Sequence, residues 1–306
     1  MDNSRATSSA PRLRDVVAVL EELYPPGTAQ SWDRVGLAAG DPDQPVTTVL
    51  LAVDPTLDVV AEAVRTGADL IVAHHPLLLR GIHSVATTSA KGATIHDLLV
   101  NDVALYCAHT NADVADPGVG HALAAACGLA ATRPLSVVED QELGRVGELD
   151  RPVSLADFAS RLAAALPPSA VGVRVSGPAD AEVRTVALLG GAGDSAFDAV
   201  RSSGADVYVT ADLRHHPALE AREESRARER AGGDGTPYLV DAGHWASEWL
   251  WLPGLRDLLA ARLGDSVSLR ISSVRTDPWD FVVGARGPRE HVPDPSADRT
   301  TTGGMP

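Results

Sequence analysis

Two stretches of this sequence share the same features in the same order and at the same spacing. Each starts with an apolar run, at Val49 and at Val186, and reaches a Gly-Ala-Asp triplet whose glycine, Gly67 or Gly204, lies 18 residues further on. Each triplet precedes a second apolar run and, later, a His-His-Pro motif. The triplet alone is a common turn from a helix into a strand, but the shared spacing and the second His-His-Pro favour an internal duplication. We therefore predict two related strand–helix–strand units.

The segments around these repeats predict an α/β fold. Apolar runs of about four to eight residues, rich in valine and leucine, alternate with segments of helical period, as in proteins with buried strands. We expect two related α/β units, with mixed sheets flanked by helices and a metal site in the cleft at the strand ends. The expected parts are a flexible N-terminus (1–10), a first unit (11–135), a connecting segment (136–185), a second unit (186–288) whose C-terminal part could pack back on the first, and a flexible tail (289–306).

Charge and cysteine content limit what this chain could bind. Its 41 acidic residues outnumber the 26 basic ones, and the net charge of −15 leaves no global basic field for nucleic acid or an anionic membrane. Cys107 and Cys127 are too few for a disulfide framework or a four-thiolate zinc site, so a bound metal would need oxygen and imidazole ligands. The first ten residues lack the apolar core of a signal peptide, and no apolar run approaches the roughly 20 residues of a membrane helix, so we expect a cytoplasmic protein.

A pair of histidines, His74 and His75, follows the apolar run Leu70-Ile-Val-Ala73 and precedes a proline. This places the pair at the carboxyl end of a predicted buried strand, where open α/β sheets form their ligand clefts. Neighbouring strand residues face opposite ways, but a chain that turns at the strand end can bring both imidazoles into one cleft. Two adjacent histidines can also be surface loop residues, so the pair alone does not define a site.

Two further strand ends carry acidic and imidazole side chains. His109 and Asp113 follow the apolar run that ends at Cys107. Asp113 could bridge two cations or cap the next helix. His109 could bind the metal itself or donate a hydrogen bond to a residue that binds it. His244 and Glu248 begin a helix after another predicted strand, and their spacing of four places both on one helix face. Each pair is a weak signal by itself.

Taken together, the three strand ends supply five side chains suited to binding metal: His74, His75, Asp113, His244 and Glu248. Carboxylates and imidazoles suit Zn, Mn or Fe. Five protein ligands exceed what one open catalytic ion usually takes. We therefore expect two divalent ions per chain, roughly 3.5–4 Å apart and sharing a bridging carboxylate.

Several segments between about residue 15 and residue 280 follow one family pattern. They are Ser31-Trp-Asp-Arg-Val-Gly-Leu37, Gly67-Ala-Asp-Leu-Ile-Val-Ala-His-His-Pro76 with Arg80-Gly81, Ala108-His-Thr-Asn-Ala-Asp113, Gly144-Arg-Val-Gly-Glu-Leu149, Gly204-Ala-Asp206 through His216, and Asp241-Ala-Gly-His244 with Glu248. In these segments the chain resembles the GTP cyclohydrolase I type 2 family, also called Nif-three-like proteins. Two positions depart from the family pattern, because Arg34 stands where Asn is common and Ala211 where Gly is common.

The resemblance implies a dinuclear metal centre held by the same five side chains and assembly into a homohexamer. It also implies a hydrolase that opens the imidazole ring of guanine in GTP and releases formate. Longer relatives insert a further domain after the segment that ends at Leu149. In this chain only a short stretch of sequence separates Leu149 from Val186, which implies the short form of the family without the inserted domain. The same ligands would also suit a protein that only binds or delivers metal, or that serves as a scaffold for a protein partner.

Other residues are candidates for supporting roles. His109 or His216 could carry protons, since imidazole titrates near neutral pH. Lys91, the only lysine among 26 basic residues, could bind an anionic group of the substrate, although a lone surface lysine can survive by chance. Asp33 is a second candidate for substrate binding. The run Gly190-Gly-Ala-Gly193 after a strand is a weak anion-site signal and is more typical of a tight turn.

Overall fold

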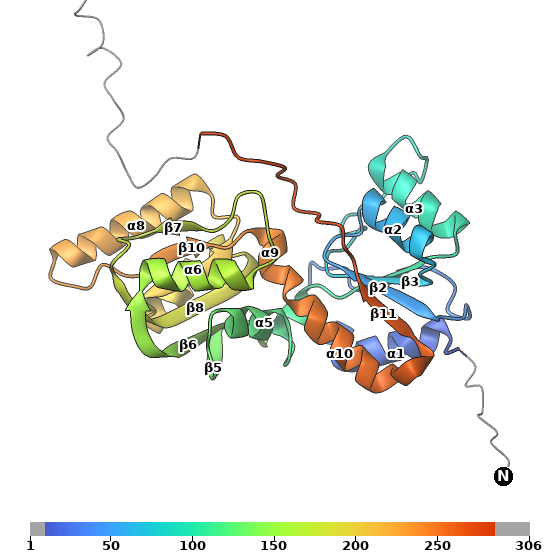
Figure 1. The fold of residues 1–306 in the computed structure, drawn as a ribbon, viewed down its shortest axis with the longest axis horizontal. Helices are drawn as coiled ribbons and strands as arrows, with labels where there is room; N and C mark the ends of the chain where they lie inside the picture. The colour runs from blue at the N-terminus through green and yellow to red at the C-terminus, as the bar shows by residue number, and fades with distance from the viewer. Residues whose placement is uncertain (1–9, 285–306) are drawn as a thin grey trace, which may run out of the picture.

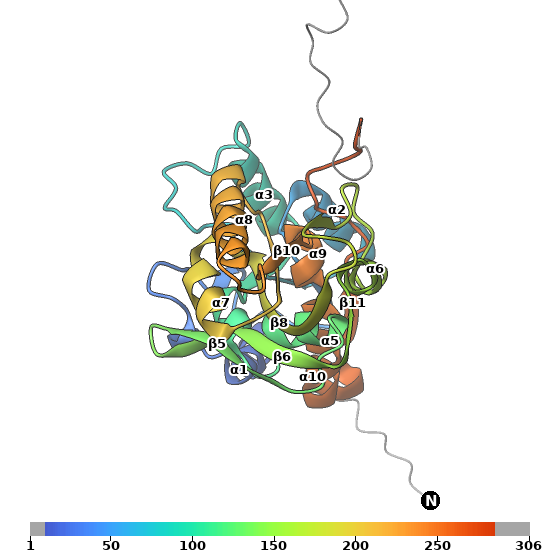
Figure 2. The same cartoon turned by 90° about the vertical axis from the view of Figure 1, so that its left-hand side faces the viewer.

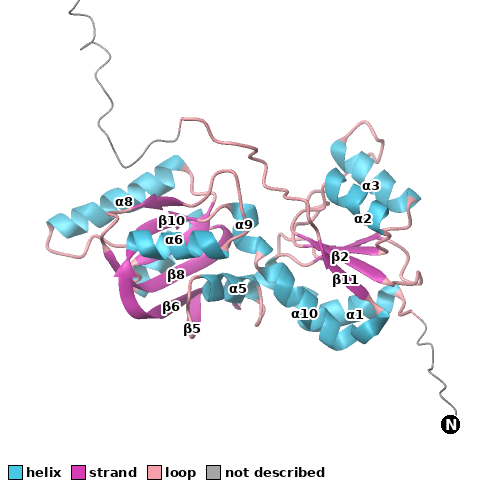
Figure 3. Ribbon diagram, viewed as in Figure 1, coloured by secondary structure: helices cyan, strands magenta, loops and turns pink. Residues whose placement is uncertain are grey.

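The computed structural model describes residues 10–284, which form two α/β units side by side (Figures 1 and 3). The predicted fold class is confirmed, since each unit contains one mixed sheet flanked by helices. The ends that we expect to be flexible, 1–10 and 289–306, lie outside the described residues apart from Ala10. None of the described helices is long and apolar enough to cross a membrane.

The sheet of the first unit has mainly parallel strands. Its order is β1 (Gly36–Ala39), β4 (Ala104–Cys107), β3 (Leu70–Ala73), β2 (Thr48–Ala52) and β11 (Ser268–Ile271), with β1 antiparallel at one edge. One face is covered by α2 (Leu57–Thr66) and α3 (Ala90–Val100), the other by α1 (Leu13–Leu23) and α10 (Trp251–Leu263). Neighbouring strand residues therefore serve different faces: Leu50 packs toward α2 and Leu51 toward α1.

The sheet of the second unit combines three parallel and three antiparallel strands. Its order is β5 (Thr132–Val138), β6 (Gln141–Ser154), β8 (Glu182–Ala192), β9 (Val207–Ala211), β10 (Tyr238–Asp241) and β7 (Arg174–Ser176). Figure 2 shows α7 (Phe197–Ser203) and α8 (His215–Arg230) on one side of this sheet and α6 (Leu155–Ala165) on the other. Helices α5 (Val119–Ala126) and α9 (His244–Trp249) lie between the units, and short 3-10 turns occur at η1 (Pro26–Thr28), η2 (Asp194–Ala196) and η3 (Gly264–Ser266).

The two units repeat one arrangement, as β2-α2-β3-α3-β4 and β8-α7-β9-α8-β10. Gly67 and Gly204 end the first helix of each copy with φ angles of +67° and +72°, a left-handed conformation that glycine adopts without strain. Asp69 and Asp206 follow, and each accepts hydrogen bonds from the backbone at the preceding strand. The predicted relation between the units is therefore visible in their local contacts as well as in their order.

The segment expected to connect the units belongs to the second unit, whereas the C-terminal part packs back on the first unit as expected. Residues 136–185, expected as a connecting segment, contribute all of β6, together with α6 and β7, to the second unit. β6 pairs antiparallel with β8, so it lies inside the sheet and not beside it. At the other end, β11 returns to the first unit and pairs in parallel with β2.

One hydrophobic core runs through both units and fixes the strand ends that face each other. The same cluster contains Leu51 of β2, Val186 of β8 and Trp251 of α10. The indole Nε1 of Trp251 donates to the hydroxyl of Tyr24 at 3.0 Å, and the two rings meet edge to face with centroids 5.5 Å apart. This shared packing allows side chains from both units to build one site.

Candidate metal centre

The carboxyl ends of β3, β4 and β10 bring the predicted ligands together between the units. His74 and His75 follow β3, and Asp113 lies on α4 (Thr110–Val114), just after β4. His244 and Glu248 lie on α9, which begins after β10. β3 and β4 end at the same edge of their sheet, which brings His74, His75 and Asp113 together. β10 belongs to the other sheet, and Glu248 on α9 lies 3.6 Å from His74 and 3.1 Å from His75, so all five side chains share one cleft.

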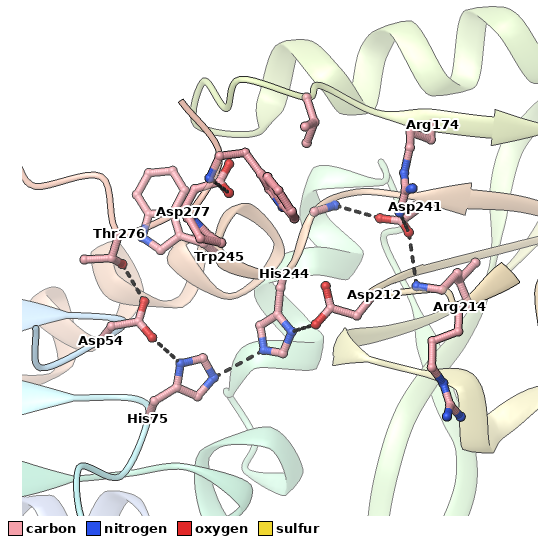
Figure 4. Close-up of a pocket in the computed structure, with 15 residues that line it drawn as sticks. Asp54, His75, Arg174, Asp212, Arg214, Asp241, His244, Trp245, Thr276 and Asp277 are labelled. Atoms are coloured by element: carbon pink, nitrogen blue, oxygen red, sulfur yellow. Dashed lines mark hydrogen bonds and ion pairs between the residues drawn. The ribbon is translucent and has the colours of Figure 1, made fainter. Parts of the chain in front are cut away.

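His75, His244 and Glu248 form one group of potential ligands among the described residues. The Nε2 atom of His75 lies 3.1 Å from Glu248 Oε2, and that of His244 lies 3.1 Å from Glu248 Oε1. The two Nε2 atoms are 3.3 Å apart, and Figure 4 shows the two rings pointing toward each other. Ligands bound at about 2.0–2.1 Å to one tetrahedral ion lie about 3.3 Å from each other. The observed separations therefore fit three ligands of a single ion.

His74 presents a buried nitrogen that lacks a hydrogen-bond partner. Its Nε2 atom lies 3.7 Å from Asp113 Oδ1 and 3.6 Å from Glu248 Oε1, too far for hydrogen bonds. Burying an unpaired polar atom is costly, whereas a cation between these groups would satisfy all three. The side chains present thus fit a divalent metal ion.

Glu248 occupies the centre of the group. Its carboxylate lies within 3.6 Å of the Nε2 atoms of His74, His75 and His244, while Asp113 approaches His74. A carboxylate that contacts imidazoles on both sides has the geometry of a bridging ligand. Glu248 is therefore better placed than Asp113 to be shared by two ions.

Each imidazole of the centre is held through its Nδ1 atom. The acceptors are the Ala108 carbonyl for His74 (2.9 Å), Asp54 for His75 (2.7 Å), Asp33 for His109 (2.9 Å) and Asp212 for His244 (2.7 Å). Such bonds fix the tautomer and leave Nε2 facing the centre. The sequence patterns pointed to neither Asp54 nor Asp212 in this role, although both follow apolar strands and a carboxylate at a strand end could have signalled it.

The charges of the cluster favour a bound cation. Burial opposes protonation of His75, but the charge of Glu248 and the bond to Asp54 outweigh it and raise the pKa of His75 to about 11. Burial also opposes protonation of His244, and bonding to Glu248 raises its pKa to about 9. Burial disfavours the ionised form of Glu248, yet the imidazoles hold its pKa well below the usual value. Burial raises the pKa of Asp113 to about 6. A divalent ion would displace protons from this cluster, so metal uptake should release them.

His109 lies beside the centre, and Asp33 lies behind His109. Asp33 is 6% exposed and also accepts hydrogen bonds from the backbone and hydroxyl of Thr110. Burial opposes ionisation of Asp33, but its bonds with His109 and Thr110 hold its pKa far below the ordinary value. A ring nitrogen of His109 lies close to those of His74 and His75, so His109 could bind metal or carry protons. Asp33 is placed to orient His109.

His216 and Lys91 lie apart from this cluster. His216 is exposed near the start of α8, where its ring contacts His215 with centroids 5.1 Å apart. Lys91 is exposed in the first turn of α3. Within the described part of the chain, neither belongs to the groups of potential metal ligands or to the lining of the neighbouring cavity. Their roles in proton transfer and substrate binding stay predictions.

The glycine-rich end of β8 makes room for Glu248. Gly191 has a φ of +66°, and its N–H donates to Ser247 Oγ at 3.0 Å. A Cβ atom at this position would overlap Glu248 Oε1 and come within 3.4 Å of His244 Nε2. Gly190 and Gly191 therefore lie in an irregular, close-packed end of β8 against the candidate metal centre, and the tight turn after a strand that the sequence favoured is not observed.

A cavity of about 710 Å³ opens beside His75 and His244 (Figure 4). Its lining includes two aromatic side chains, Trp245 and Trp279, and two basic ones, Arg174 and Arg214. The two guanidinium groups form ion pairs with carboxylates, Arg174 with Asp241 at 2.5 Å and Arg214 with Asp194. Planar rings and guanidinium groups thus lie in the same space as two potential metal ligands.

Comparison with known proteins identifies the family. The sequence pattern of the Duf34/NIF3 (NGG1p interacting factor 3) family matches residues 11–278. A Streptomyces coelicolor protein named GTP cyclohydrolase 1 type 2 homolog is 48% identical over 277 residues, which cover 88% of this chain and 94% of that protein. A Mycobacterium bovis protein of the same name is 34% identical over 379 aligned positions, covering 88% of this chain and 97% of that protein. The aligned length exceeds this chain, so the mycobacterial relative contains additional residues.

The fold agrees with this comparison. The crystal structure of a Bacillus cereus protein related to NIF3 has a TM-score of 0.80 and 26% identity, covering 90% of this chain and all of that one. The match in sequence spans nearly the whole described region, and the match in structure includes both units. This chain belongs to the Duf34/NIF3 family and has the short form that lacks an inserted domain.

Proposed function

We propose that this protein is a hydrolase that depends on two divalent metal ions. The observation that carries the proposal is the spacing of His75, His244 and Glu248, whose ligand atoms lie 3.1–3.3 Å apart next to the unpaired buried Nε2 of His74. One ion would bind within this group. The second would lie near His74, with Glu248 shared between the two positions.

The side chains of the centre would divide the work between positioning and proton transfer. Bound divalent ions would lower the pKa of water toward neutrality and polarise the bond under attack. Asp54 and Asp212 would keep His75 and His244 oriented toward the ions. His109, whose Nδ1 is held by Asp33, would use Nε2 to accept and return a proton.

The proposed substrate is a guanine nucleotide. This choice rests on the name of the Streptomyces coelicolor relative and on the contents of the cavity. Trp245 and Trp279 could stack on a planar base, and Arg174 and Arg214 could face its phosphates. Water would attack C8 of guanine and open the imidazole ring, and a second hydrolysis would release C8 as formate.

Formate release tests this function directly. Protein loaded with Zn, Mn or Fe is incubated with GTP, and formate is measured alongside the metal content. We expect wild-type protein to release formate and Glu248→Gln to lose this activity. Glu22→Gln, the same change at an exposed carboxylate that instead pairs with Arg262 at 2.7 Å, should retain it. Full metal loading without formate for all three metals would refute a GTP hydrolase.

A second candidate is a protein that binds metal and a protein partner without turnover. The family description, NGG1p interacting factor 3, favours this alternative. It uses the same ligands, so metal content cannot separate the two functions. Metal-loaded protein that is inert toward GTP would support the second candidate.

We also propose that the chain assembles into a closed homo-oligomer, with a hexamer as the expected form. Trp279, Phe281 and Val283 alternate along the C-terminal segment and are 61%, 77% and 83% exposed. Clustered apolar side chains at a surface commonly mark a protein contact. Light scattering that reports a stable monomer at micromolar concentration would refute this assembly.

A further inference from the structure

The segment after β11 connects the first sheet to the rim of the metal centre. Ser272 and Ser273 anchor its start, since their hydroxyl groups donate to the buried carboxylate of Glu62. The segment then passes Asp54 and reaches the cavity, where Thr276 and Trp279 are part of the lining. A stretch distant in sequence from every expected ligand therefore lies within hydrogen-bond reach of the centre.

Thr276 contacts the carboxylate that holds His75. Its hydroxyl donates to Asp54 Oδ2, while Asp54 Oδ1 accepts the bond from His75 Nδ1 at 2.7 Å (Figure 4). One carboxylate oxygen thus serves the imidazole and the other serves the threonine. With both oxygens engaged, the plane of the Asp54 carboxylate is fixed.

The same three-residue pattern occurs at His109, whose ring centroid lies 5.4 Å from that of His75. The Thr110 hydroxyl donates to Asp33 Oδ2 at 2.6 Å, and Asp33 Oδ1 accepts from His109 Nδ1 at 2.9 Å. Both chains of contacts run from threonine to aspartate to histidine. Their recurrence around one cluster argues that the Thr276 contact is more than a chance surface bond.

We propose that Thr276 is a positioning residue of the metal centre, acting through Asp54 on the tautomer and ring orientation of His75. A hydroxyl donor that fixes the carboxylate keeps Nδ1 of His75 occupied and Nε2 directed at the metal position. The C-terminal segment is then a functional part of the centre although it supplies no ligand. This inference rests on the metal centre of the proposed function and not on turnover of GTP.

Two substitutions at residue 276 test the role of the hydroxyl. Thr276→Val keeps the shape of the side chain and removes the donor, whereas Thr276→Ser keeps the donor. Full-length protein is titrated with Co²⁺ against a competing chelator, and the visible absorption of bound Co²⁺ is recorded. We expect Thr276→Val to weaken one Co²⁺ by about tenfold and change its spectrum, because partners of metal-binding histidines contribute on this scale. Thr276→Ser should stay within about twofold of wild type.

A matched control separates this effect from general loss of a buried hydroxyl. Thr94 in α3 is buried, and its hydroxyl donates to the carbonyl of Ala90 at 2.9 Å, so Thr94→Val makes the same change outside the centre. It should bind both ions as wild type does. Unchanged Co²⁺ affinity in Thr276→Val, or an equal loss in Thr276→Ser, would overturn the proposal.

A double-mutant cycle tests whether Thr276 acts through Asp54. In an Asp54→Ala background both acceptor oxygens are already lost, so adding Thr276→Val should cause little further change in Co²⁺ affinity. Full additivity of the two effects would show that Thr276 acts by another route and would refute the proposed chain of contacts. Wild-type protein that takes up no Co²⁺ would overturn it as well. Absence of formate with both ions bound would refute the GTP hydrolase alone.

Discussion

Replacing Gly191 by alanine should damage the metal centre while leaving the fold in place. Gly191 lies at φ +66°, and an added Cβ would fall about 1 Å inside the roughly 3.3 Å at which carbon and oxygen touch, against Glu248 Oε1. Glu248 is 3% exposed and lies between three imidazoles, so it cannot move aside without leaving them. The substitution therefore displaces the central carboxylate.

The substitution should lower both the stability of the fold and the affinity for metal, and these two effects can be measured separately. A non-glycine residue in the left-handed region loses about 1–2 kcal/mol of stability from backbone strain. Displacing the Glu248 carboxylate by about 1 Å should weaken metal binding tenfold to a hundredfold, the range seen when the supports of metal ligands are removed. Gly67→Ala isolates the first cost, since Gly67 has a φ of +67° with no atom within 4 Å of the added Cβ.

The assay combines metal titration with denaturant unfolding of the metal-free protein. Both variants should lose unfolding free energy from backbone strain, Gly191→Ala at least as much as Gly67→Ala, while only Gly191→Ala should bind Co²⁺ or Zn²⁺ more weakly. If Gly191→Ala and Gly67→Ala bound metal with equal affinity, the close approach of Gly191 to Glu248 would not matter for the centre. The assignment of Glu248 as the central ligand would then be wrong.

Three further substitutions probe the roles of single side chains. Asp113→Ala should lose one ion and Glu248→Ala should weaken both, as elemental analysis would show, because Glu248 contacts three imidazoles and Asp113 approaches one. Glu62→Gln should cost about 2 kcal/mol of unfolding free energy at pH 7. Burial disfavours the ionised form of Glu62, but the bonds from Ser272 and Ser273 outweigh it and lower the pKa of Glu62. The difference in unfolding free energy between wild type and Glu62→Gln should therefore persist above the ordinary pKa of 4.5 and shrink as pH falls below it, which denaturant unfolding across pH would measure. Lys91→Arg should leave metal content unchanged and, if Lys91 holds an anionic substrate, weaken binding of that substrate about tenfold. Unchanged turnover would show that Lys91 has no role in substrate binding.

Local sequence signals were sufficient to predict the fold class and to predict that three of the candidate ligands lie close together. Strands such as Leu70–Ala73 and Ala104–Cys107 are apolar throughout because parallel strands are covered on both faces. His74, His75 and Asp113 follow these strands closely, so the parallel arrangement is enough to place them at one edge. Neither inference needed knowledge of distant contacts.

Contacts between distant segments were beyond the reach of such signals. The edge strand β11 is four residues long, Ser268–Ile271, and no residue in it is fully buried, so its pairing with β2 leaves little trace in its sequence. The partners of the imidazoles are equally non-local, since Asp33 lies 76 residues from His109. Acidic residues after strands are common, and only the folded chain selects the ones that orient a ligand.

The differences between the two units explain how a duplicated scaffold builds one shared centre. At their common spacing, His75 of the first unit corresponds to Asp212 of the second, and Asp54 corresponds to Gly191. Asp212 does not take the position of a candidate ligand and instead accepts a hydrogen bond from Nδ1 of His244, in its own unit, at 2.7 Å. An aspartate like Asp54 at the position of Gly191 would fill the space that the Glu248 carboxylate occupies. Glycine at this position of the second unit therefore leaves the space in which α9 brings His244 and Glu248 beside the candidate ligands of the first unit.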